Sequence, residues 1–170
     1  MILTGINTTK KLLIGHQCLQ ALFEQGYRRT EFSNLRDLVV YVKSLSDDLV
    51  HALAFFLQGL PRGLKTLSII GRQATATLME ELPLAPFRAY RFKAGFWEAQ
   101  NLLCIQNLEK VKLEVFDQNG LELLEYLLDN YTLLKELDII FTSPLPTPIQ
   151  RKIDVLETCP TLTLNLHDRL

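Results

Sequence analysis

The stretch Leu64-Lys-Thr-Leu67-Ser-Ile69 decides the fold, because leucine or isoleucine occupies its first, fourth and sixth positions. In a β-strand alternate side chains point to the same face, so Leu67 and Ile69 face one side of a sheet. Leu64 lies on the approach to that strand and faces the same side. The pattern L-x-x-L-x-L therefore predicts a short strand with one buried face and one open face.

The same pattern recurs along the chain, with 21 to 29 residues between successive fourth positions. Clear copies cover 35–40, 108–113 and 134–139, a weaker copy covers 87–92, and degenerate copies cover 9–14 and 161–166. Each strand is too short to be stable alone, and stacked repeats of roughly 20–29 residues are typical of leucine-rich-repeat proteins. The sequence predicts an α/β leucine-rich-repeat solenoid of about seven short parallel strands.

The segments between the strands predict helices on the convex side of this solenoid. Apolar residues at three- and four-residue spacing indicate helices over 49–60 and 121–128. Further helices are expected over 149–156 and 74–82, whereas three prolines predict a loop over 142–148. An ordinary α/β sheet also alternates parallel strands with helices and stays as the alternative. The regular phrasing of the repeat favours the solenoid.

The composition excludes several classes of protein. The 170 residues are 48% hydrophobic and carry a formal net charge of -1. A surface that neutralises phosphates needs an excess of lysine and arginine, so nucleic acid is not expected as a partner. The longest uncharged run, 49–61, is too short to span a bilayer, so no membrane is expected either. Cys18, Cys104 and Cys159 lie far apart, which fits small buried thiols in a cytoplasmic or nuclear protein.

Motifs for catalysis and metal binding do not occur in the sequence. His16, His51 and His167 are scattered, and none has a second ligand at metal-binding spacing. There is no nucleophile elbow and no glycine-rich phosphate loop. We therefore expect no catalytic residue, no metal and no cofactor, and we predict that the protein is not an enzyme.

The third, fifth and seventh positions of each copy point away from the core, onto the open face of the sheet. They predict an apolar patch, then a basic cluster, then two carboxylates. The predicted partner-binding residues are Val39, Tyr41 and Ile70, then Arg91, Lys93, Lys110 and Lys112, then Glu136 and Asp138. An aromatic anchor beside charges is typical of a protein-binding surface, so the expected partner is another protein. The basic cluster also fits an acidic peptide or a polyphosphate.

Several segments resemble a plant family, the F-box/leucine-rich-repeat proteins. Phe32-Ser-Asn-Leu-Arg-Asp-Leu-Val-Val40 is similar to the start of their repeats, and residues 49–69 resemble their helix-then-strand phrase. Leu108-Glu-Lys-Val-Lys-Leu113, the glycine-containing turn after it and Cys159-Pro-Thr-Leu-Thr-Leu164 resemble the FBD module that ends many of these proteins. The resemblance divides the chain into a repeat segment, 1–107, and an FBD-like segment, 108–170, in one continuous solenoid.

The resemblance implies a non-enzymatic interaction module like the substrate-binding part of an F-box ubiquitin-ligase adaptor. The F-box, which docks on the cullin adaptor, is missing from the sequence, so we expect target binding without delivery, as a competitor or protective partner. The alternatives are an intracellular immune-receptor-type repeat fragment and a receptor for an anionic small molecule such as a polyphosphate. Neither end of the array carries a polar cap, which predicts a homo-oligomer through a terminal strand edge or a partner that covers it.

Overall fold

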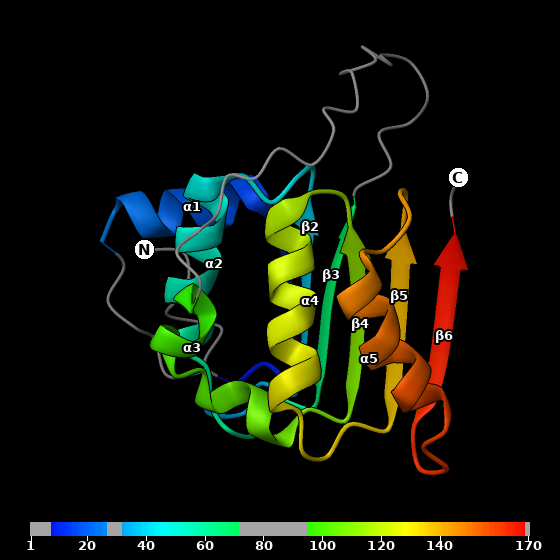
Figure 1. Cartoon of the computed structure of the whole chain (residues 1–170). Helices are drawn as coiled ribbons and strands as arrows, with labels where there is room; N and C mark the ends of the chain where they lie inside the picture. Colours follow the sequence, from blue (N-terminus) through cyan, green and yellow to red (C-terminus); the bar gives the residue numbers. More distant parts are fainter. Residues whose placement is uncertain (1–7, 27–31, 72–94, 169–170) are drawn as a thin grey trace.

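The computed structural model describes residues 8–26, 32–71 and 95–168, which form a six-stranded parallel sheet (Figure 1). The strands are β1 (Lys11–Gly15), β2 (Asp37–Val42), β3 (Thr66–Gly71), β4 (Lys110–Val115), β5 (Glu136–Phe141) and β6 (Thr163–Asp168). Their order across the sheet follows their order in the sequence. The predicted α/β class with parallel strands is confirmed.

The described helices lie together on one face of the sheet (Figure 1). They are α1 (His16–Glu24), α2 (Asp47–Gln58), α3 (Phe96–Gln100), the 3-10 helix η1 (Leu103–Asn107), α4 (Gln118–Asn130) and α5 (Thr147–Glu157). The helices predicted around 49–60, 121–128 and 149–156 are confirmed, and the one predicted over 74–82 lies outside the described residues. The predicted loop is shorter than expected, because Thr147 and Pro148 already belong to α5. A proline fits in the first turn of a helix because the N–H that it lacks would have no partner within the helix.

The core forms where the strand pattern predicts it. In the four copies that contain β2 to β5, the first, fourth and sixth side chains are between 0% and 8% exposed. They pack against apolar helix residues such as Leu53 and Leu57 of α2 and Leu124 of α4. The buried face of the sheet is therefore the face under the helices, and the third, fifth and seventh positions lie on the opposite face.

One predicted strand does not take the place that the pattern gives it. The copy at 87–92 should lie between β3 and β4, and it falls outside the described residues. However, β3 pairs directly with β4, with Leu67 opposite Val111 and Ile69 opposite Leu113. The prediction of a strand between them is wrong, because an apolar pattern predicts which residues form a strand but does not set which strands are neighbours. The described part of the chain has six strands in the sheet rather than about seven.

The strands begin in line with one another. The backbone N–H groups of Arg36 and Asp37 both donate to the carbonyl of Lys10, at 2.8 and 2.9 Å. The same double contact from the next strand recurs on the carbonyls of Arg36, Lys65 and Glu109. The second position of each copy therefore fixes the register of the following strand. The division predicted between the repeat segment, 1–107, and the FBD-like segment, 108–170, lies between β3 and β4, which are hydrogen-bonded neighbours in one sheet.

Candidate functional site on the open face of the sheet

The open face carries rows of side chains, each row taking one residue from every strand. The third-position row holds Lys11, Asp37, Thr66, Lys110, Glu136 and Thr163, and the fifth-position row holds Leu13, Val39, Ser68, Lys112, Asp138 and Asn165. Neighbours in a row lie about 4.8 Å apart, because this is the spacing of hydrogen-bonded strands. Side chains from separate repeats are therefore direct neighbours.

The apolar half of this face lies on β1, β2 and β3. Tyr41 is opposite Ile70 in the register of β2 and β3, and Val39 lies two residues before Tyr41 on the same face. These three predicted residues are brought together, and all are partly exposed. Leu13 of β1 lies opposite Val39 and is 54% exposed, so it enlarges the group. We call Leu13, Val39, Tyr41 and Ile70 the apolar patch.

The charged half lies on β4, β5 and β6. Lys110 forms an ion pair with Glu136, with 2.7 Å between Nζ and Oε2. The hydrogen bond and the charge of Glu136 raise the pKa of Lys110 above its ordinary value. Lys112 is the register neighbour of Asp138, whose carboxylate accepts a hydrogen bond from the amide of Asn165. All four predicted residues on β4 and β5 thus lie together.

This arrangement corrects the predicted basic cluster. Two of its members, Arg91 and Lys93, lie outside the described residues. The other two, Lys110 and Lys112, lie next to carboxylates of β5, so this strip is charge-balanced instead of basic. The sequence pattern treats the lysines and the carboxylates as successive features, but equal positions of adjacent parallel strands are neighbours in space.

Glu114 is a buried carboxylate at the end of β4 that sequence reasoning did not single out. It is 3% exposed, and its Oε2 accepts a hydrogen bond from the backbone N–H of Gly71 at 2.7 Å. A Cβ on Gly71 would lie 2.7 Å from the ring of Phe116, so a larger residue here would have to displace that ring. The sequence does contain a signal for Glu114. It occupies the seventh position of its copy, and the same position holds the apolar or aromatic residues Tyr41 in β2 and Ile70 in β3.

The described part of the chain offers few side chains suited to metal binding or nucleophilic catalysis. No group of three or more histidine, cysteine, aspartate or glutamate side chains there could hold a metal ion. Burial raises the pKa of Cys104 to about 12, which keeps this thiol protonated and unreactive. Cys104 is buried as predicted, but Cys18 is exposed and Cys159 only partly buried, so the expectation of three buried thiols is wrong.

Comparison with known proteins assigns no family to the chain. No protein-family model, no curated protein and no solved structure matches it. Among the described helices, none combines the length and the hydropathy needed to cross a membrane. The candidate site therefore rests on the geometry of the open face.

Proposed function

We propose that the protein is a non-enzymatic recognition module that binds another protein on the open face of its sheet. The observation that carries this proposal is the apolar patch, which lies on a face that no described helix covers, next to the charged strip of β4 and β5. Protein interfaces commonly combine an apolar centre with a polar rim that sets register and partner choice. The open face offers both parts on adjacent strands.

We also propose that the repeats form a leucine-rich-repeat solenoid rather than a doubly wound sheet. Doubly wound folds carry helices on both faces and reverse their strand order at a switch point. In the described residues the helices share one face, the strand order is sequential, and strands β2 to β5 all start from the same backbone contact. These features support the resemblance to the substrate-binding part of plant F-box/leucine-rich-repeat proteins, acting in the cytoplasm or nucleus as a competitor or protective partner.

The receptor for an anionic small molecule is the weaker proposal. A polyphosphate needs several uncompensated cations, whereas Lys110 is held by Glu136 and Lys112 lies beside Asp138. An immune-receptor-type repeat fragment would use the same open face for protein binding, so it differs in biological setting and not in the proposed site.

The experiment that tests the open face is quantitative capture from a native lysate by the wild-type protein and by two variants. Val39→Ser combined with Tyr41→Ser removes the centre of the apolar patch, and Val155→Ser is the matched control, since Val155 is 69% exposed on α5. We expect proteins retained by the wild type and the control to be lost from the double variant. Equal retention by all three folded proteins would contradict the proposal.

A second copy of the chain is the proposed partner for a terminal strand. The sixth position of the copies that contain β2 to β5 is at most 1% exposed, but Leu166 of β6 is 36% exposed. Leu164 on the same strand is also only partly buried. A strand with an unpaired edge and incompletely covered apolar side chains favours pairing with another chain.

A further inference from the structure

A polar cleft of about 420 Å³ opens in the helix layer, on the side of the sheet away from the open face. It lies between α3 and η1 on one side and the C-terminal end of α4 on the other, near the end of the molecule where the strands begin (Figure 1). Its polar lining comes from Glu98, Asn101, Gln106, Asn107, Asn130 and Thr132. Its volume is typical of small-ligand sites, which measure roughly 300–1,000 Å³.

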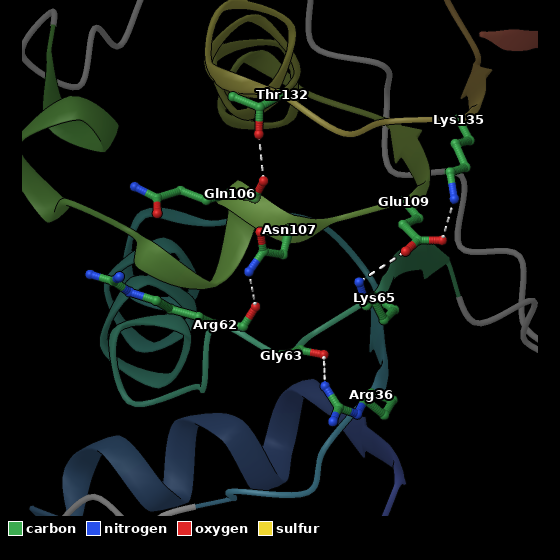
Figure 2. Close-up of polar contacts among 9 residues, drawn as sticks. All are labelled: Arg36, Arg62, Gly63, Lys65, Gln106, Asn107, Glu109, Thr132 and Lys135. Carbon is green, nitrogen blue, oxygen red and sulfur yellow. Dashed lines mark hydrogen bonds and ion pairs between the residues drawn. The ribbon is translucent and has the colours of Figure 1, made fainter. Parts of the chain in front are cut away.

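Hydrogen bonds hold three side chains of the cleft in place and leave their oxygen atoms able to accept further bonds. The amide of Asn107 donates to the carbonyl of Arg62 at 2.8 Å, and the amide of Asn130 donates to the carbonyl of Tyr126 at 2.9 Å. Thr132 donates its only hydroxyl hydrogen to the carbonyl of Gln106 (Figure 2). The threonine oxygen keeps its lone pairs, and both asparagine side chains are anchored with a carbonyl oxygen still able to accept.

The charge around the cleft is negative. Among the described residues, Glu98 is the only charged side chain in the lining, and it forms no ion pair with another of them. Helices α1 to α5 together carry nine carboxylates and only two basic side chains. Lys152 neutralises Glu125 and Asp129, but Glu98 is not among its partners.

Two further observations also indicate negative charge near the cleft. The pKa of Glu122 on α4 is raised, first by burial and then by neighbouring carboxylates that include Glu98. The C-terminal end of α4 also contributes to the lining, and the carbonyls at a helix C-terminus carry partial negative charge. A cationic group that donates several hydrogen bonds therefore matches both the charge and the acceptors of the cleft.

We propose that this cleft binds a primary ammonium or guanidinium group, with Glu98 as its counter-ion and Asn107, Asn130 and Thr132 as hydrogen-bond acceptors. The group belongs either to a lysine or arginine side chain of a protein or to a free polyamine, since both present the same chemistry. The cleft is separate from the open face, so a test of cation binding in the cleft is independent of a test of the proposed protein-binding function.

The test is an NMR titration of the full chain with three probes: N-acetyl-arginine amide, spermidine and the neutral N-acetyl-glutamine amide. We expect saturable shifts of the Asn107 and Asn130 side-chain amides with at least one cation and none with the neutral probe. A response to the arginine probe alone identifies a guanidinium group as the ligand, and a response to spermidine alone identifies a primary ammonium group.

Two isosteric variants separate the site from general attraction of cations to an acidic surface. Glu98→Gln should weaken binding about tenfold, the effect of losing roughly one charge-assisted hydrogen bond. Glu157→Gln, which removes an exposed charge of α5, should leave the affinity unchanged. The proposal is overturned if neither cation gives saturable shifts, if the neutral probe binds equally well, or if both variants lose the same affinity.

Discussion

At the scale of single residues, Glu109 has the most directly testable role. Its carboxylate joins Lys65 and Lys135 at 2.9 and 3.0 Å, across the starts of β3, β4 and β5 (Figure 2). Hydrogen bonds from Lys65 and Lys135 lower the pKa of Glu109 below its ordinary value of 4.5. Because the folded pKa is depressed, this stabilisation is complete above the unfolded value and is lost as the pH falls through the folded pKa.

We therefore expect Glu109→Gln to destabilise the protein at pH 7 and to lose this effect in acid. Urea unfolding of the wild type and the variant at pH 7, 5, 4 and 3 measures the difference in free energy of unfolding. The difference should shrink as the pH falls below about 4.5. A difference that stays constant across this range would mean that the two lysines do not act through the charge of Glu109.

The three cysteines should differ sharply in reactivity. Cys18 is exposed, Cys104 is buried with a pKa of about 12, and hydrogen bonds with Thr161 lower the pKa of the partly buried Cys159. With an aromatic disulfide reagent at pH 8, we expect Cys18 and Cys159 to react in the folded protein and Cys104 to react only in denaturant. Peptide mapping by mass spectrometry identifies the sites, and modification of Cys104 without unfolding would contradict its burial.

At the scale of elements, the start of α4 is tied to the loop that precedes α2. Asp117 is the N-cap of α4 and accepts the N–H of Gly120 at 2.9 Å, while its other oxygen accepts the N–H of Leu45 at 2.7 Å. Asn119 donates to the carbonyl of Leu45 and to the carboxylate of Asp47. Two helices separated by about 70 residues are thus joined at their N-terminal ends.

Asp117→Ala should cost about 2–3 kcal/mol of stability, because it removes a helix cap and leaves the N–H of Leu45 without this partner. Asp154→Ala is the matched control, since Asp154 is an exposed carboxylate of α5 whose loss should change stability by less than about 0.5 kcal/mol. Urea unfolding followed by circular dichroism measures both. Equal stability of the two variants would show that the link contributes nothing.

Strands and helices could be predicted from the sequence because their apolar positions repeat. Leu67 and Ile69 alternate along one strand, so they lie on the same face of the sheet, and both are buried beneath the helices. The pairing of β3 with β4 could not be predicted, since the weak copy at 87–92 has the same apolar pattern as the copies that contain β3 and β4. Leu13, at the fifth position of a degenerate copy, is not among the predicted partner-binding residues, although it extends the apolar patch.

Contacts between repeats explain the remaining differences. Glu136 neutralises Lys110 only because parallel pairing aligns their positions, and a reading of one repeat at a time does not show it. The cleft in the helix layer combines Glu98, Asn107 and Asn130 from three local segments that carry no motif. Sites assembled from several ordinary segments leave no local pattern, so the three-dimensional structure is needed to find them.

At the scale of the whole molecule, the outer edge of β6, which pairs with no other described strand, predicts self-association. Leu166→Lys places a charge where a second copy would approach an incompletely covered strand. We expect the wild type to form a concentration-dependent dimer in light scattering and the variant to remain monomeric. A strictly monomeric wild type at high micromolar concentration would contradict association through this edge.

The central claim is a sheet in sequence order, with one face under the helices and one face that no described helix covers. The most direct test pairs Ser68→Cys on β3 with Lys112→Cys on β4, two register neighbours on the open face, in a chain that also carries Cys18→Ser and Cys159→Ser. Adjacent strands bring the Cα atoms within the roughly 4.4–6.8 Å that a disulfide allows, and an intervening strand would hold them about 10 Å apart. Under mild oxidation we predict an internal disulfide in this pair and none in the control pair Ser68→Cys with Asp138→Cys. Free thiols in the first pair, or a disulfide in the control pair, would contradict the account.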